Sequence, residues 1–284
     1  MKIIVTGSES FIGKELIKQC KKKKISVFLI DLIHGLDIRS PEIHKYLPKN
    51  ADAIVHLAAL SFSNKIEDYP VACFSTNVLG TLNLINTVKK NNIKRFIFAS
   101  SEWIYGESKS AREKKEDSKI DTEKIINPYA LSKIVSENNL RSQFLQGFCP
   151  TTILRFSIVY GPRKQGSSAI ESLFNSVKLH NKVNVGSLKT ARRFIHVTDV
   201  ASGIMAVLLK KESGFKIYNL SSDKLISLRE VINITSQVLN TKPSVFESDP
   251  DNFSIRNPSN KKFKNVFKWK PKINLQTGLK TLDA

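Results

Sequence analysis

The 284-residue chain contains little cysteine and no long apolar run. Its three cysteines, Cys20, Cys73 and Cys149, are odd in number and widely spaced, which excludes a disulfide framework, a CxxC redox pair and a zinc site. No segment approaches the roughly 20 apolar residues of a membrane span, and the N-terminus lacks a signal-type block. We therefore expect a soluble, cytoplasmic protein with no metal site and no membrane partner.

Acidic residues are also scarce, because 45 lysines and arginines stand against 25 acids and give a net charge of +20. Such a charge attracts polyanions, including nucleic acids and phosphorylated metabolites. The lysines are nevertheless spread in short runs such as residues 21 to 24, with few aromatic residues between them to stack on bases. A solvated, lysine-rich surface is therefore favoured over nucleic-acid binding.

Apolar runs alternate with amphipathic stretches in the first half of the chain. The predicted strands are Lys2 to Val5, Ser26 to Ile30, Ala53 to Leu57, Arg95 to Ala99 and Thr152 to Tyr160. This alternation predicts an α/β fold with a doubly wound parallel sheet. After Gly161 and Pro162 the segments become shorter and prolines punctuate the tail, which indicates a smaller and less regular lobe.

The first predicted strand ends in TGSESFIG, residues 6 to 13. Gly7 suits a tight turn from strand to helix, and Gly13 suits close packing of that helix, whose N-terminal amides can bind a pyrophosphate. Ser10 stands where a dinucleotide loop has its middle glycine, so its side chain is expected to crowd the phosphates. Glu9 places a negative charge in the same loop and should point to water.

The second predicted strand is followed by Asp31, roughly 20 residues past the loop. A carboxylate there accepts hydrogen bonds from an adenosine ribose and repels a 2′-phosphate, so NAD is preferred over NADP. Asp37 and Ile38 follow a short loop and are predicted to reach the adenine edge.

The stretch NPYALSK, residues 127 to 133, predicts the start of a helix that continues to about Leu145. Asn127 is a good N-cap and Pro128 suits the first helical position. Tyr129 and Lys133, four residues apart, then lie on one helix face. The ammonium, the helix dipole and a nicotinamide cation all favour the phenolate, so Tyr129 is predicted to be a general base. An amphipathic surface pair is the alternative.

A hydroxyl follows the strand that precedes this helix, in SSEWIYG, residues 100 to 106. The carboxyl ends of parallel strands form the crevice where such sheets bind ligands. Ser101 could therefore hydrogen-bond the substrate oxygen that Tyr129 deprotonates, although serines are also common turn residues.

Taken in order, these motifs resemble the extended short-chain dehydrogenase/reductase family, the NAD-dependent epimerases and dehydratases of nucleotide sugars. The resemblance includes HLAA (56–59), NVLGTLNL (77–84), LRFSIVYGPR (154–163), RRFIHVTDVA (192–201), YNLSS (218–222) and KWKPKINLQTGL (268–279), and covers nearly the whole chain. It implies a Rossmann-type domain at residues 1–160 and 190–222, and a substrate lobe at 161–189 and 223–284. It also implies a nucleotide-diphosphate sugar as substrate and pairing into a homodimer through the helices after Asn77 and Tyr129.

The resemblance assigns catalysis to Ser101, Tyr129 and Lys133, and NAD as the cofactor. The residues that it implies for NAD binding are Gly7, Ser10, Phe11, Ile12, Gly13, Asp31, Asp37, Ile38, Leu57, Ala58, Ala59, Asn77, Ser100, Tyr129, Lys133 and Phe156. Substrate binding would involve Ser101, Glu102, Trp103, Arg163 and Arg192, with Arg192 on the diphosphate.

The chain departs from the family pattern at three places. Dehydratases of the family have an Asp-Glu pair after the catalytic hydroxyl, whereas this chain has Glu102 and Trp103, so elimination of water is disfavoured. Ile158 replaces the asparagine of RxxNxYGP. The arginine before a PGD turn has no clear counterpart in SDPD, residues 248 to 251. The last two losses weaken the expected binding of a nucleotide diphosphate.

A 4-epimerase that passes through a keto sugar is the first functional hypothesis, because it needs no acid or base beyond Tyr129. A keto-sugar reductase that uses NADH or NADPH once per turnover is the close alternative. A third hypothesis, motivated by the charge of +20 and by Ser10, is a non-catalytic binding protein on the same fold.

Overall fold

The computed structural model describes residues 1–61, 69–125, 127–163 and 168–283. Its larger part is a six-stranded sheet in the order β10-β5-β4-β3-β1-β2, in which every neighbouring pair is parallel. The strands are β1 (Lys2–Thr6), β2 (Ser26–Ile30), β3 (Ala53–His56), β4 (Phe96–Ser101), β5 (Thr151–Phe156) and β10 (Phe215–Leu220). The predicted parallel α/β fold is confirmed.

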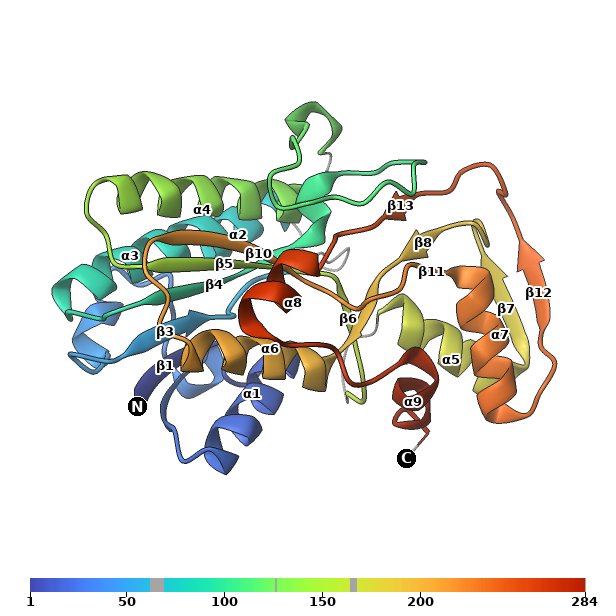
Figure 1. Cartoon of the computed structure of the whole chain (residues 1–284), viewed down its shortest axis with the longest axis horizontal. Helices are drawn as coiled ribbons and strands as arrows, with labels where there is room; N and C mark the ends of the chain where they lie inside the picture. The colour runs from blue at the N-terminus through green and yellow to red at the C-terminus, as the bar shows by residue number, and fades with distance from the viewer. Residues whose placement is uncertain (62–68, 126, 164–167, 284) are drawn as a thin grey trace.

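Helices cover both faces of this sheet (Figure 1). On one face lie α1 (Phe11–Lys22) and α6 (Val197–Leu209), and on the other α2 (Tyr69–Phe74), the π-helix η3 (Ser75–Leu79), α3 (Gly80–Lys90) and α4 (Pro128–Leu145). Alternate residues of β1 enter the two cores, because Ile3 and Val5 pack on the α1 side and Ile4 packs on the α3 side. A sheet buried on both faces explains the continuous apolar runs of the sequence.

The predicted strand over Thr152 to Tyr160 is wrong in one respect, because the structure divides it. β5 ends at Phe156, and Ser157 N–H donates to the Leu220 carbonyl at the edge of the sheet. The following β6 (Ile158–Tyr160) pairs instead with β9 (Phe194–His196). Both halves are apolar, so the sequence could not reveal that they have different partners.

The absence of a segment long enough to span a membrane is also corrected. Helix residues Tyr69–Lys90, 22 in number, are long and apolar enough by length and composition. Within the described structure they form a core helix: Leu84, Ile85 and Val88 are buried against the sheet. Burial in the core accounts for the apolar residues on the inner side of this helix, whereas Val71, Leu79 and Leu82 are exposed.

The smaller lobe has its own core, which includes Phe174, Val231 and Leu279. It contains α5 (Ala169–His180), β7 (Lys182–Val185), α7 (Leu228–Leu239), β12 (Ser244–Glu247) and α9 (Leu275–Lys280), and a small sheet in the order β11 (Ile226–Ser227), β8 (Ala191–Arg192) and β13 (Ile255–Arg256). Capping boxes at Ser168 and Ser227 start α5 and α7.

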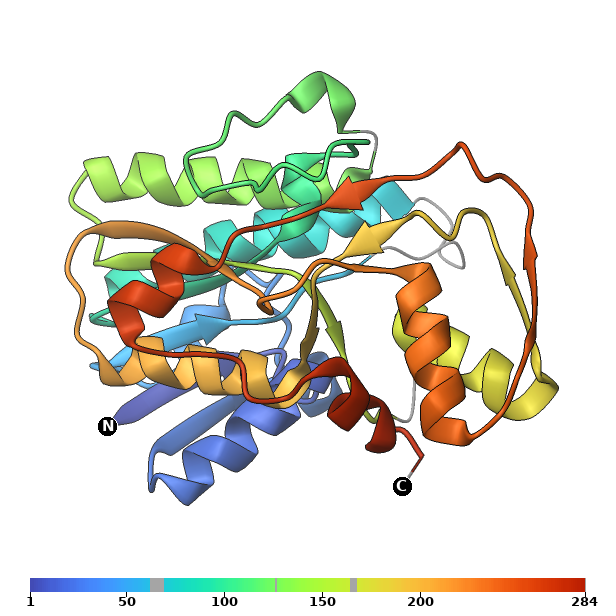
Figure 2. The same cartoon turned by 45° about the vertical axis from the view of Figure 1, so that its right-hand side comes forward.

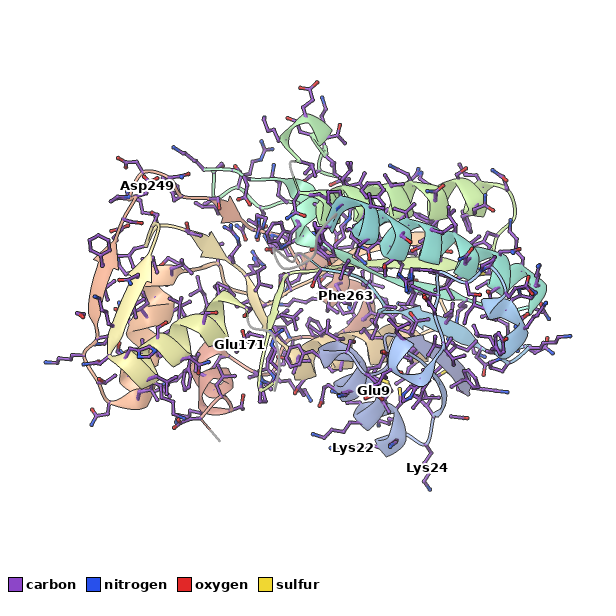
Figure 3. All side chains as sticks on the ribbon, turned by 180° about the vertical axis from the view of Figure 1, so that it is seen from behind. Glu9, Lys22, Lys24, Glu171, Asp249 and Phe263 are labelled. Atoms are coloured by element: carbon purple, nitrogen blue, oxygen red, sulfur yellow. The ribbon has the colours of Figure 1, made fainter. Side chains whose placement is uncertain are left out.

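The tail returns from this lobe to the larger domain (Figure 2). Helix α8 (Lys261–Phe267) packs on β10 and buries Phe263 in the main core, while Glu171 of α5 lies at the junction of the two parts (Figure 3). Short 3-10 turns η1 (Leu32–His34), η2 (Ile43–Tyr46), η4 (Glu102–Tyr105) and η5 (Thr122–Lys124) connect the elements. The division at 161–189 and 223–284 stays a prediction.

Candidate functional site

A cavity of about 1280 Å³ opens at the carboxyl ends of β1 and β3. In the sheet, β1 lies between β2 and β3, so the chain first adds a strand on one side of β1 and then continues on the other. The strand order therefore reverses here, and open parallel sheets bind ligands at such a reversal. The cavity is larger than the roughly 300–1,000 Å³ of typical small-molecule pockets. Predicted residues that line it are Gly7, Ser10, Phe11, Asp31, Asp37, Ile38, Leu57, Ala58 and Ala59.

The glycine loop requires glycine at both of its ends. Gly7 has φ of +68°, and a Cβ there would lie 2.6 Å from the Ala58 nitrogen. A Cβ on Gly13 would lie 2.2 Å from the Gly7 carbonyl oxygen. Real Cβ contacts are not that short, so only glycines let α1 approach β1 and β3 so closely. Gly13 and Ile12 therefore shape the loop from beneath the cavity, since Ile12 packs against the main core.

Ser10 caps the helix that the loop starts. Its hydroxyl accepts a hydrogen bond from Gly13 N–H at 3.1 Å, so one of the N-terminal amides of α1 is already satisfied. Ser10 still lines the cavity, but its hydroxyl is directed to the helix end. The serine therefore has a structural reason to be where a glycine was expected.

Glu9 also lines this cavity instead of pointing freely to water. Its carboxylate pairs with Lys14 at 3.3 Å and with His34 at 3.2 Å, and the side chain is one-third exposed. The His34 and Lys14 hydrogen bonds lower the Glu9 pKa. The negative charge is thus kept at the cavity wall.

Asp31 fixes the loop through the main chain. Its Oδ2 accepts from Glu9 N–H at 2.9 Å, and its Oδ1 accepts from Ile33 N–H at 3.3 Å. Both partners are neutral amides, so neither hydrogen bond brings a cation to this carboxylate, and a carboxylate at this position disfavours the 2′-phosphate of NADP. Asp37 lies farther along the wall, where a hydrogen bond from Arg39 lowers its pKa.

Helix α4 begins as predicted, with Asn127 as N-cap accepting from Tyr129 N–H at 2.8 Å and Pro128 in the first turn. Lys133 Nζ lies 5.6 Å from the centre of the Tyr129 ring and donates to the Ala99 carbonyl at 2.8 Å. Ser101, at the end of β4, hydrogen-bonds with the Tyr129 side chain. The three side chains are therefore brought together at the carboxyl end of β4.

The acid–base state of these groups differs from the expectation. Burial raises the pKa of Tyr129 to about 12, against a smaller lowering by the Ser101 hydrogen bond. Burial lowers the pKa of Lys133 to about 8, so its ammonium is easily deprotonated. In the protein alone desolvation outweighs the helix dipole and the lysine, and the phenol stays protonated at neutral pH.

Several residues predicted to bind the cofactor do not line the cavity. Asn77, in the π-helical turn, accepts from Leu60 N–H and donates to the Leu60 carbonyl, which fixes the loop after β3. Ser100 donates to Glu137 at 2.5 Å, and Phe156 is packed in the main core. Asn77 thereby holds Leu60, which lines the cavity. Tyr129 and Lys133 also do not line this cavity.

Arg163, which was predicted to bind the substrate, lines the cavity at the carboxyl ends of β1 and β3. Its guanidinium stacks on Phe11, 4.1 Å from the ring centre, and donates to Glu171 at 2.8 and 2.5 Å. Glu171 belongs to α5 of the smaller lobe, so this ion pair connects the glycine loop to that lobe. Arg163, predicted to bind the substrate, thus lines the same cavity as residues predicted to bind NAD.

A second polar cluster adjoins Ser101. Glu102 is fully buried, and its Oε1 accepts from Arg256 Nε at 3.1 Å. The Arg256 guanidinium lies 4.3 Å from the centre of the Trp103 ring. Arg192, predicted to bind the diphosphate, is the register partner of Arg256 in the small sheet. Burial raises the Glu102 pKa, partly offset by Arg256.

Sequence reasoning missed cavity and cluster residues that depend on distant contacts. They include Lys14, Arg39, His196 and Thr198 at the cavity, and Glu107 and Arg256 at the cluster. Arg256 had one weak signal, since it is the only arginine after Arg229 in the sequence. Nothing in the local pattern of residues 253 to 258 connects it with Glu102.

The comparisons with known proteins agree with this geometry. A family model described as the NAD dependent epimerase/dehydratase family matches residues 3–221. The chain is 28% identical to UDP-glucuronate 4-epimerase of Thermodesulfobacterium geofontis over 80% of this chain and 70% of the relative. It is 25% identical to GDP-6-deoxy-D-mannose reductase of Pseudomonas aeruginosa, covering 99% and 95%. The crystal structure of Thermus thermophilus UDP-glucose 4-epimerase in complex with NAD superposes with a TM-score of 0.84, at 25% identity and covering 100% and 98%.

Proposed function

Because the chain belongs to the NAD-dependent epimerase/dehydratase family, we propose that it is a nucleotide-sugar 4-epimerase that works through a transient keto sugar. The observation that carries this proposal is the state of the residues after Ser101. Trp103 stands where a second carboxylate would serve elimination, and the buried Glu102 is held by Arg256. Tyr129 is then the group available for proton transfer at a sugar hydroxyl.

The cavity fits NAD. The glycine positions at which a Cβ would collide allow the backbone to approach a pyrophosphate, and Asp31 offers a carboxylate to a ribose. Residues of the glycine loop, Asp31 and Ala58 would hold the cofactor, and NAD when bound supplies a hydride acceptor and donor.

The chain's own residues supply the proton chemistry and the positioning. Ser101 hydrogen-bonds Tyr129 and can also bind the reacting hydroxyl, which orients that hydroxyl toward the phenol. Once it is deprotonated, Tyr129 accepts the proton of this hydroxyl and later returns it to the same oxygen. Lys133, charged below about pH 8, stabilises the phenolate electrostatically and is itself held by the Ala99 carbonyl.

We expect the purified protein with NAD bound to convert a nucleotide sugar into its C4 epimer without consuming added NADH. UDP-glucose, UDP-glucuronate, GDP-mannose and a nucleotide 4-keto sugar are incubated with and without NADH, and the products are separated by chromatography. The alternative, a keto-sugar reductase, is favoured by the full-length match to the Pseudomonas enzyme. Stoichiometric oxidation of NADH by a keto sugar, with no epimer formed, would establish the reductase instead.

A cytoplasmic homodimer belongs to the same proposal. An apolar depression on α2, η3 and α3 is lined by Pro70, Val71, Phe74, Ser75, Val78, Leu79 and Leu82. Val71 is 70% exposed and Leu79 is 46% exposed, and Leu131 of the adjacent α4 is also exposed. A second copy would bury this face through a two-fold, self-complementary interface.

The double substitution Leu79→Glu and Leu82→Glu is expected to convert the dimer to a monomer, because four charges would have to be buried in the paired interface. Light scattering coupled to size-exclusion chromatography measures the mass. Leu209→Glu is the matched control, since Leu209 is exposed at the end of α6 on the opposite face of the sheet. An unchanged dimer mass in the double variant would place the interface elsewhere.

A further inference from the structure

Two arginines of the smaller lobe lie side by side near η4, the turn that follows β4. Arg192 of β8 and Arg256 of β13 are register partners on parallel strands, and both residues are buried. Both contact the same carboxylate: Arg192 donates to Glu107 Oε2 at 3.4 Å, and Arg256 donates to Glu107 Oε1 at 2.5 Å. Glu107 follows the turn that begins at Ser101, so this pair adjoins the proposed reaction centre.

The Glu107 carboxylate lies on the solvent side of the two guanidiniums. Its side chain is 48% exposed, whereas those of Arg192 and Arg256 are 11% and 4% exposed. An anion that enters from solvent therefore meets Glu107 before it can reach either arginine.

An anion could replace Glu107 as the charge partner of the two arginines. Two guanidiniums are crowded together here, because register partners on adjacent strands contact one carboxylate, and burial and the nearby Arg256 lower the pKa of Arg192 to about 10. Glu102 neutralises Arg256 through one oxygen, while its Oε2 is buried without a hydrogen-bond partner among the described residues. Glu102 and Glu107 both lie near the two cations, but Glu102 is fully buried, whereas Glu107 is the carboxylate of this cluster that water can already solvate.

We propose that Arg192 and Arg256 form a two-arginine oxyanion site for the substrate, and that Glu107 occupies this site until the substrate displaces its carboxylate. Arginine pairs bind phosphate and carboxylate oxygens in the same bidentate manner, so the displaced anion is either the diphosphate or a carboxylate on the sugar. Arg256 thereby supplies the second cation that the SDPD turn lacks. The inference rests on the proposed nucleotide-sugar substrate.

The test compares affinities in the protein saturated with NAD. UDP, UDP-glucose and UDP-glucuronate are titrated by calorimetry, together with pyrophosphate, which contains no base. Glu107→Gln is expected to bind the displacing ligand about five- to tenfold more tightly than the parent, because the competing internal anion is lost. Arg256→Lys keeps the charge but loses the fork geometry and should bind about fivefold more weakly. Thermal unfolding verifies that both variants are folded.

Glu113→Gln is the matched control, because Glu113 pairs with the buried Arg193 at 2.7 Å outside this cluster. It should leave every affinity within about twofold. Tighter binding of all four probes by Glu107→Gln identifies the diphosphate as the displacing anion, and tighter binding of UDP-glucuronate alone identifies the sugar carboxylate. Unchanged or weaker binding of every probe by this variant, when the parent binds UDP, overturns the inference alone. Absence of binding of all four probes to parent and variant overturns it together with a uridine-diphosphate sugar as the substrate.

Discussion

Substitution of Tyr129 by phenylalanine is expected to lower kcat by about 10²- to 10⁴-fold, the usual contribution of a positioned general acid–base group. The ring remains and continues to fill its place near Lys133, so only the hydroxyl and its hydrogen bond with Ser101 are lost. NAD affinity and thermal stability should therefore change little. Initial rates at saturating substrate, with a fluorescence titration of NADH, separate catalysis from binding.

Tyr46→Phe is the control for this experiment, because Tyr46 is 63% exposed. It should retain the parent kcat. If Tyr129→Phe keeps more than about a tenth of the parent rate, another group accepts the substrate proton, and the assignment of Tyr129 as general base is incorrect.

The parent enzyme also tests how kcat depends on pH. A general base acts when deprotonated, and Tyr129 in the protein alone has a pKa of about 12, so proton abstraction should become faster as pH rises from 6 to 8. Above about pH 8 Lys133 loses its proton and no longer stabilises the phenolate, which should flatten the increase. A kcat of the parent enzyme that falls steadily between pH 6 and 8 would contradict the role of Tyr129 as a general base.

The sequence predicted those features that are determined by neighbouring residues. Asn127 and Pro128 predicted where α4 starts. Gly7 and Gly13 predicted the tight turn between β1 and α1, because only glycine fits the close approach of strand and helix there. The break at Ser157 was missed because two equally apolar segments select different strands as partners. A contact pattern over many residues, and not a local signal, decides such a pairing.

The candidate site was predictable to a similar extent. Tyr129, Lys133 and Ser101 could be named from spacing and strand ends, whereas the Tyr129 pKa depends on burial, which no local pattern states. The contact of Arg256 with Glu102 joins residues 154 positions apart, and Arg163 reaches the cavity by stacking on Phe11. In both cases the fold decides the partner of a long cationic side chain, because several partners would be chemically acceptable.

Loss of the buried carboxylate of Glu137 is expected to have the largest effect on stability among the substitutions considered. Glu137 of α4 receives two hydrogen bonds from Arg155 of β5, at 3.1 and 2.8 Å, and one from Ser100 of β4. The Arg155 side chain is 4% exposed, so Glu137→Ala leaves a buried positive charge without its partner. We expect the free energy of unfolding to fall by about 3–5 kcal/mol, measured by urea denaturation.

The double variant Glu137→Gln with Arg155→Met distinguishes lost charge balance from lost packing. Both charges are absent from it, so it should recover most of the stability, because replacing a whole buried pair often costs little. Glu42→Ala, which removes an exposed pair with Lys45, should leave the free energy of unfolding nearly unchanged. If the double variant is as unstable as Glu137→Ala, the network stabilises α4 against β4 and β5 through its hydrogen bonds and shape. That result would assign to Glu137 the positioning of Ser100, and with it the neighbouring Ser101, independently of the charge on Arg155.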